Sequence, residues 1–149
     1  MGWSLFLPLA SGDAHYMAAL RVPLADTDIE FDAQILALAK IMVDSLNESA
    51  LVNACPAAAE LEGSISRYEQ YGKANALPEL ESHVSTLQAI QALRSSSVAH
   101  RKGSRFTSVK SKLGFDSVDR ITAFEQILRS AARMLVSISS HLRTLAPGG

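Results

Sequence analysis

The chain has 149 residues, of which 48% are hydrophobic and 19% are charged, and its formal net charge is −1. This length predicts one domain that buries roughly two-thirds of the surface exposed by its unfolded chain. The hydrophobic fraction and the absence of low-complexity tracts exclude a disordered or fibrous protein. We therefore expect one compact globular unit.

The single Cys55 excludes an internal disulfide, and the sequence has neither a CxxC pair nor a Cys/His cluster for zinc. We expect a cytoplasmic protein that uses no metal and no other cofactor. The apolar start, residues 1–10, lacks a basic segment, contains Pro8 and is too short to span a bilayer, so no membrane association is expected. This start and the Gly-Gly end are also compatible with excision from a larger parent protein.

Residues 1–25 contain Pro8, Gly12 and Pro23 and predict an irregular N-terminal arm. A long amphipathic helix is predicted to follow. It has cap residues at 26–28, ends near 47–50, and has apolar positions at Phe31, Ile35, Leu38, Met42 and Leu46.

A second helix is predicted from Pro56 to about Tyr71, with Gly72 as the residue that ends it. A third helix is predicted to begin at Pro78 and to lead directly to Arg94. Its apolar face consists of Leu80, Val84, Leu87, Ile90 and Leu93. Residues 95–116 predict a loop with a short helical piece.

The last helix is predicted to be capped by Asp116 or Ser117 and has the most regular apolar spacing in the chain. Its seam consists of Ile121, Phe124, Leu128, Ala131, Leu135, Ile138, Leu142 and Leu145. Because no alternating strand pattern of useful length is present, the predicted fold class is all-α. We expect a bundle of four to five helices over residues 26–146.

Basic residues are concentrated in one part of the chain. Residues 1–81 contain twelve Asp and Glu against four Lys and Arg, whereas residues 82–115 contain six basic residues and no acidic residue. Such a cluster is typical of a polyanion-binding surface, although a solvated basic loop explains it equally well. The six residues are Arg94, Arg101, Lys102, Arg105, Lys110 and Lys112.

The segment from Leu93 to Gly103 reads LRSSSVAHRKG and places Arg94 six residues before His100. This pattern resembles the R-x4-6-H motif of HEPN domains, the nucleotide-binding helical bundles of higher eukaryotes and prokaryotes. Ser95 is a polar residue of the kind that commonly follows the family's arginine, although many members have Asn or Asp there. A long amphipathic helix also follows the motif, so the resemblance covers most of residues 26–146.

The resemblance implies a metal-independent endoribonuclease that acts as a homodimer, in which the motifs of two subunits form one cleft. His100 would be the acid and base, and Arg94 would bind the phosphate. RNA-binding residues would be Ser95, Arg101, Lys102 and Arg105. A toxin or phage-defence effector fits this chemistry, with an antitoxin or a larger parent protein as a further partner.

Helical geometry limits how the two motif residues can meet. On one uninterrupted helix, six residues place Arg94 and His100 about 120° apart around the axis. We therefore expect either that the helix breaks within Ser95–Ser97 or that the partner subunit completes the site.

Other interpretations remain open at this point. Arg94 could cap the carbonyl end of the third helix while His100 lies on a surface loop. The chain could be a non-catalytic HEPN-like module that binds RNA, a nucleotide or a protein, or a plain helical dimerisation domain. His15, His83, His141, Tyr68 and Tyr71 are interpreted as structural residues.

Overall fold

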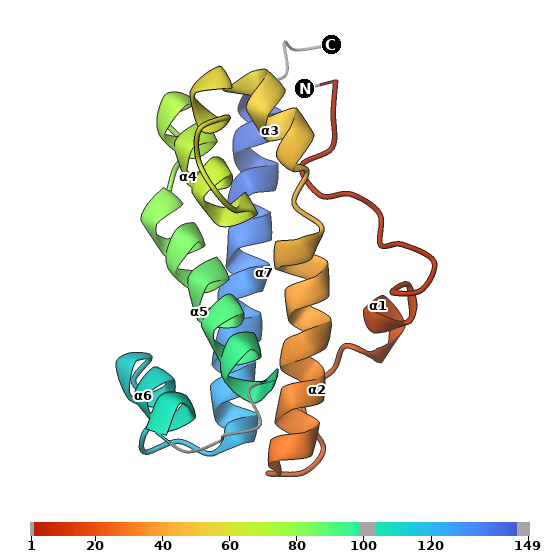
Figure 1. The fold of residues 1–149 in the computed structure, drawn as a ribbon, viewed down its shortest axis with the longest axis vertical. Coiled ribbons are helices and arrows are strands. Elements are labelled where there is room, and N and C mark those ends of the chain that lie inside the picture. Colours follow the sequence, from red (N-terminus) through yellow and green to blue (C-terminus); the bar gives the residue numbers. More distant parts are fainter. Residues whose placement is uncertain (1, 99–103, 146–149) are drawn as a thin grey trace.

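The structure is a computed structural model that describes residues 2–98 and 104–145, without the side chains of residues 97, 98, 104–106 and 145. The described residues are all-helical, with 68% of them in helices, which confirms the predicted all-α class (Figure 1). The structure describes seven α-helices, where four to five were expected. Its elements are α1 (His15–Ala19), α2 (Asp28–Ala39), the π-helix η1 (Lys40–Asp44), α3 (Glu48–Ala54), the 3-10 helix η2 (Pro56–Ala58), α4 (Ser64–Ala74), α5 (Leu80–Val98), α6 (Ser104–Lys112) and α7 (Arg120–Leu145).

The centre of the molecule consists of α2, α5 and α7, which contact one another pairwise. The apolar positions predicted for α5 face this core, and Leu87, Ile90 and Leu93 are fully buried. Phe31 of α2 and Phe124 of α7 meet edge to face, with ring centroids 6.5 Å apart. The core therefore depends on the three longest helices, whose apolar positions were predicted from the sequence.

The first long helix begins as predicted but ends differently. The Thr27 hydroxyl accepts a hydrogen bond from the Glu30 amide, and the acidic residues Asp28 and Glu30 lie in the first turn, where the helix dipole favours them. After Ala39 the backbone widens into the π-helix η1, which ends at Asp44. Residues 47–50, where we predicted the end, instead begin α3.

The predicted second helix is wrong at both ends. Pro56 starts only the short helix η2, and Gly63, with a φ of 83°, separates it from α4. That positive φ strongly favours glycine. Gly72 does not end α4: it is buried inside the helix, where a Cβ atom would lie 2.4 Å from a Leu80 methyl group.

The last helix begins at Arg120, a few residues after the predicted caps. The Asp119 carboxylate accepts a hydrogen bond from the Thr122 amide at 2.6 Å and so caps α7 in place of Asp116 or Ser117. At the same end, Arg120 contacts Asp28 at 2.8 Å and Asp26 at 3.4 Å, which joins the N-termini of α7 and α2.

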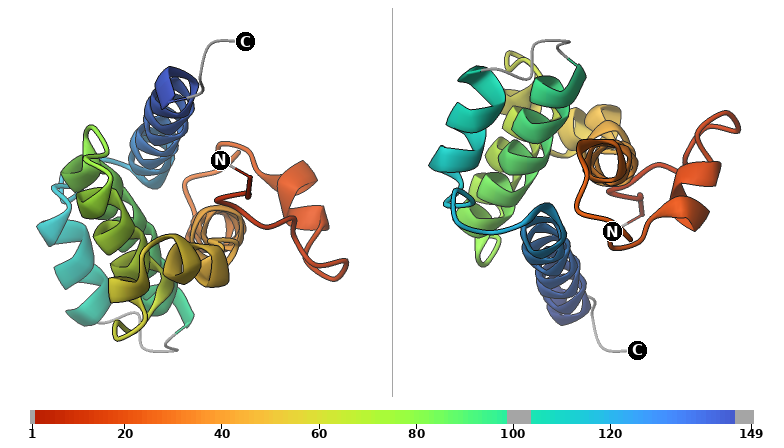
Figure 2. Two further views of the ribbon diagram at one scale, coloured as in Figure 1. Left: turned by 90° about the horizontal axis from the view of Figure 1, so that it is seen from above. Right: turned by 90° about the horizontal axis from the view of Figure 1, so that it is seen from below.

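The N-terminal arm is irregular apart from α1, and it packs on the bundle. Figure 2 shows it on one side of α2, with α4, α5 and α6 on the other. Leu5 is buried, Phe6 forms an isolated antiparallel bridge with Leu46, and the Gln34 side chain bonds the arm at Ala19 and Arg21. Within the residues described, no helix is long and apolar enough to cross a membrane.

Candidate functional site

Arg94 lies in the last third of α5, with its side chain 21% exposed. Of the two alternatives expected for the motif, a helix break within Ser95–Ser97 is not observed, because α5 continues without interruption to Val98. The reason is local packing: Ser96 is fully buried, and its hydroxyl donates to the Leu93 carbonyl at 2.8 Å, so it follows the helix instead of ending it. Arg94 is consequently one turn before Val98, the last described residue of α5.

The Arg94 guanidinium contacts the side chains of Asp44 and Gln91. Its Nη1 lies 2.7 Å from Oδ1 of Asp44, and its Nη2 donates to Oε1 of Gln91 at 3.1 Å. Asp44 belongs to η1, fifty residues earlier in the chain. The arginine is therefore oriented between its own helix and the end of the preceding long helix.

This contact is part of a chain of alternating charges. The Lys40 ammonium lies 3.5 Å from Asp44 and 3.3 Å from Asp13 of the arm. The hydrogen bond to Asp13 raises the pKa of Lys40, which keeps this side chain cationic. We call Asp13, Lys40, Asp44 and Arg94 the charge chain. It places two cations, Lys40 and Arg94, and two carboxylates beside α5, where sequence reasoning identified only Arg94.

The π-helix explains how Lys40 and Asp44 reach this position. Both residues lie on η1, whose wider turn changes the direction of side chains relative to α2. The interior residues Met42 and Val43 remain buried, so the core is maintained while the charged positions face the surface. π-Helical turns are frequent at functional sites. No sequence signal marked this turn, because the apolar spacing from Phe31 to Leu46 fits an ordinary α-helix.

The remaining motif residues are only partly described. Ser95 is exposed on α5, next to Arg94. His100, Arg101 and Lys102 lie outside the described residues. Arg105 lies in the first turn of α6, with its side chain outside the description, and α6 packs against α5. The structure thus places Arg94 and Ser95 on one helix and leaves the meeting of Arg94 with His100 a prediction.

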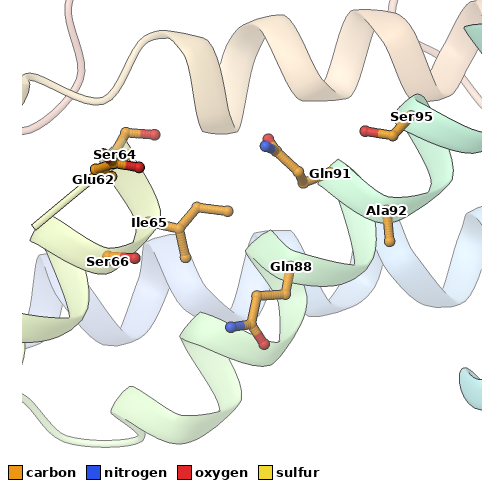
Figure 3. Close-up of a pocket in the computed structure, with 9 residues that line it drawn as sticks. Glu62, Ser64, Ile65, Ser66, Gln88, Gln91, Ala92 and Ser95 are labelled. Atoms are coloured by element: carbon orange, nitrogen blue, oxygen red, sulfur yellow. The ribbon is translucent and has the colours of Figure 1, made fainter.

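A surface cavity of about 410 Å³ lies beside the charge chain, between α5 and the start of α4 (Figure 3). Gln91, which contacts Arg94, and Ser95, which follows it, both belong to its lining. The described residues that line it are Glu62, Gly63, Ser64, Ile65, Ser66, Gln88, Gln91, Ala92 and Ser95. Its position connects it directly with the candidate motif.

His83 is a core residue, as interpreted from the sequence. It is 2% exposed, and its Nδ1 lies 2.9 Å from the hydroxyl of the fully buried Tyr68. Burial lowers the pKa of His83 and raises that of Tyr68, so both side chains stay neutral in the folded protein. Nε2 of His83 is buried without a hydrogen-bond partner among the described residues. Tyr71 is half-buried and packs edge to face on Trp3, with ring centroids 5.5 Å apart.

A second, apolar cavity of about 210 Å³ lies between the arm, η1 and α7. Several large apolar side chains around it are exposed: Met17 by 61%, Leu7 by 47% and Leu135 by 42%. Val136, next to Leu135, is 65% exposed. The predicted seam of α7 is therefore divided, since Phe124, Ala131 and Ile138 are buried in the core while Leu135 faces outward.

Among the residues that the structure describes, no group of three or more His, Cys, Asp or Glu side chains is arranged to hold a metal ion. Comparisons of the chain with protein-family models, with curated proteins and with solved structures found no significant match. The HEPN resemblance therefore depends on the Arg94–His100 motif and the helical layout alone.

Proposed function

We propose that this chain is a metal-independent endoribonuclease of the HEPN type, with Arg94 and His100 in its cleft. The observation that carries the proposal is the placement of Arg94. Its guanidinium is oriented at the surface by Asp44 of a π-helical turn, beside a second cation, Lys40, and six residues before His100. Oriented arginine is suited to phosphate because its planar donors match two phosphate oxygens.

The reaction requires three groups. A base removes the proton of the ribose 2′-hydroxyl, the 2′-oxygen attacks the adjacent phosphorus, and the bond from phosphorus to the 5′-oxygen breaks as an acid protonates that oxygen. Histidine titrates near neutral pH and serves as base and acid, which assigns this role to His100. Arg94 stabilises the charge that develops on the phosphate. The products are a 2′,3′-cyclic phosphate and a 5′-hydroxyl.

RNA would extend over the basic segment that follows the motif. Ser95, Arg101, Lys102 and Arg105 are the proposed backbone contacts, with Lys110 and Lys112 further along α6. Binding that depends on such phosphate contacts weakens as salt concentration rises. The biological role consistent with this activity is a toxin or phage-defence effector, held inactive by an antitoxin or by a parent protein.

A homodimer is part of the same proposal, because the resemblance implies that the motifs of two subunits form one cleft, and α5 shows no break within Ser95–Ser97 that would let one chain form the site alone. A partner's motif would supply the missing group. The exposed apolar residues Leu7, Met17, Leu135 and Val136 are the surface that supports self-association.

The same apolar surface favours a second candidate function, a helical dimerisation domain without catalysis. A non-catalytic HEPN-like module that binds RNA is the intermediate case. The three functions differ in measurable ways. The endoribonuclease cleaves RNA, the dimerisation domain dimerises without binding RNA, and the non-catalytic module binds RNA without forming a cleavage product.

The test is cleavage of a labelled RNA by purified protein in excess EDTA, with the product ends identified. We expect 2′,3′-cyclic phosphate ends, and the His100→Ala variant should lose at least about a hundredfold in rate. His141→Ala is the matched control, since this histidine lies on α7, outside the motif. Equal rates for the unmutated chain and His100→Ala would contradict the proposal, and so would cleavage that EDTA abolishes.

A further inference from the structure

The cavity between α4 and α5 has a lining that suits a neutral, hydrogen-bonding ligand. Among the described residues around it, Glu62 is the one charged side chain, and none is Lys, Arg or aromatic. A phosphate group would be repelled by the Glu62 carboxylate. The cavity is therefore chemically different from the neighbouring charge chain, which contains the cations Lys40 and Arg94.

The polar groups of the lining come from both helices. Figure 3 shows Gln88, Gln91 and Ser95 projecting from α5, with Glu62, Ser64 and Ser66 at the start of α4. Each amide offers both donors and an acceptor, whereas the carboxylate only accepts. Ile65 and Ala92 add apolar surface between these groups. A planar, neutral ring with polar edges matches this combination.

The cavity is also adjacent to the proposed phosphate-binding residue. Gln91 contributes to its lining and accepts a hydrogen bond from Arg94 at 3.1 Å, and Ser95 is the next residue of the chain. A nucleotide whose phosphate is bound by Arg94 therefore has its base within reach of the cavity. Single-stranded RNA is recognised in this way, by hydrogen bonds to the edges of unstacked bases.

Resting on the proposed function, we infer that this cavity is a base-specificity subsite that holds one nucleobase of the bound RNA. The Glu62 carboxylate selects bases with an exocyclic amino group, because such a group donates a hydrogen bond to it. Adenine, cytosine and guanine have this donor and uracil does not. The bound RNA is thus expected to favour A, C or G over U at one position next to the phosphate held by Arg94.

The experiment measures the affinity of the full chain for fluorescent 12-mers of A, C and U at two salt concentrations. We expect oligo(U) to bind at least about tenfold more weakly than oligo(A) or oligo(C), as the loss of a hydrogen bond to a charged group predicts. Glu62→Gln should reduce this ratio to below about two, and Ala92→Leu, which fills the cavity wall, should do the same. The salt dependence should stay unchanged, because the phosphate contacts remain.

Two matched controls separate the effect from surface charge and folding. Glu60→Gln removes an exposed carboxylate two residues from Glu62 and outside the lining, and Ala132→Leu enlarges an exposed alanine on α7. Both should keep the ratio of the unmutated chain. Circular dichroism of each variant verifies the helical content.

The outcomes distinguish this inference from the proposed function. Equal affinity for the three oligomers, or the same ratio in Glu62→Gln and Ala92→Leu as in the unmutated chain, overturns the subsite while cleavage at Arg94 and His100 still stands. Micromolar binding of free AMP that Ala92→Leu abolishes and that oligo(A) does not displace also overturns it, since the occupant of the cavity is then a free nucleotide. Absence of all RNA binding at low salt contradicts both proposals.

Discussion

Arg94 is oriented by a carboxylate, and this contact determines how the arginine would act on RNA. Asp44 lies 2.7 Å from its Nη1 and is itself 35% exposed, so the pair lies in a partly hydrated environment. An ion pair of this kind contributes little to stability, roughly 0–1 kcal/mol. Its larger effect is on geometry, because it fixes the plane of the guanidinium relative to α5.

Removing the Asp44 carboxylate should therefore affect cleavage more than folding. For Asp44→Asn we expect about a tenfold loss of rate, with a thermal midpoint within about 3 °C of the unmutated chain. Asp13→Asn is the matched control, since it removes a carboxylate of the charge chain that contacts Lys40 and not Arg94. A rate that is unchanged in Asp44→Asn would show that the ion pair has no positioning role.

The buried pair of His83 and Tyr68 predicts a pH dependence of stability. Burial lowers the folded-state pKa of His83 below its usual 6.5, so the unfolded chain takes up a proton first as the pH falls. This contribution to stability is complete above pH 6.5 and is lost as the pH falls from 6.5 through the lowered pKa. Urea denaturation should show decreasing stability from pH 7.5 to pH 5.

His83→Gln provides the comparison, because an amide can accept the Tyr68 hydroxyl without titrating. The variant should be less stable at pH 7.5 and should lose less stability on acidification than the unmutated chain. Parallel curves for the two proteins between pH 7.5 and pH 5 would contradict this account of His83.

The helices with long apolar stripes were predictable from the sequence. The irregular segments that connect them, such as the π-helix η1 and the turn at Gly63, were not. The spacing of Leu87, Ile90 and Leu93 identified the buried face of α5, and the repeats in α2 and α7 identified the other core helices. The π-helix and the role of Gly63 were missed because both depend on how neighbouring elements pack. The contact of Asp44 with Arg94 spans fifty residues, so no local pattern reveals it.

A substitution of Gly63 tests directly whether the backbone of this connecting turn requires glycine. Its φ of 83° and ψ of 149° lie in a region that is essentially restricted to glycine, although a Cβ atom would meet no neighbour within 4 Å. Gly63→Ala should therefore destabilise the fold by about 1–3 kcal/mol through backbone strain alone. Gly12→Ala, also in open space and without a positive φ, should change the free energy of unfolding by less than about 0.5 kcal/mol in urea. Equal stabilities of the two variants would contradict the strain argument.

At the scale of the whole molecule, the apolar surface and the charge chain both include residues of the π-helix η1 and of the N-terminal arm. Ile41, Met42 and Ser45 border the apolar cavity, whereas Lys40 and Asp44 belong to the charge chain. The proposed dimer would use the apolar side, which includes Val136 and Leu135 of α7. The π-helix thus joins the surface proposed for self-association to the surface proposed for RNA, as a cleft shared by two subunits requires.

A charge on the apolar surface should disrupt the proposed dimer without unfolding the chain. Val136 is 65% exposed, so Val136→Glu leaves the core intact and should shift the protein to a monomer in analytical ultracentrifugation. Gln126→Glu adds the same charge at an exposed position elsewhere on α7 and should leave the mass unchanged. A dimer that persists in Val136→Glu would place the interface on another surface.

The central claim is that Arg94 binds the scissile phosphate, and its most direct test is the cleavage rate of Arg94 variants. We expect Arg94→Ala to lose about a hundredfold or more, and Arg94→Lys to recover only part of this loss because it lacks the planar fork. Arg129→Ala, which removes an exposed arginine of α7 that pairs with Glu125, should cleave at the normal rate. Cleavage by Arg94→Ala at the rate of the unmutated chain and of Arg129→Ala would contradict the account.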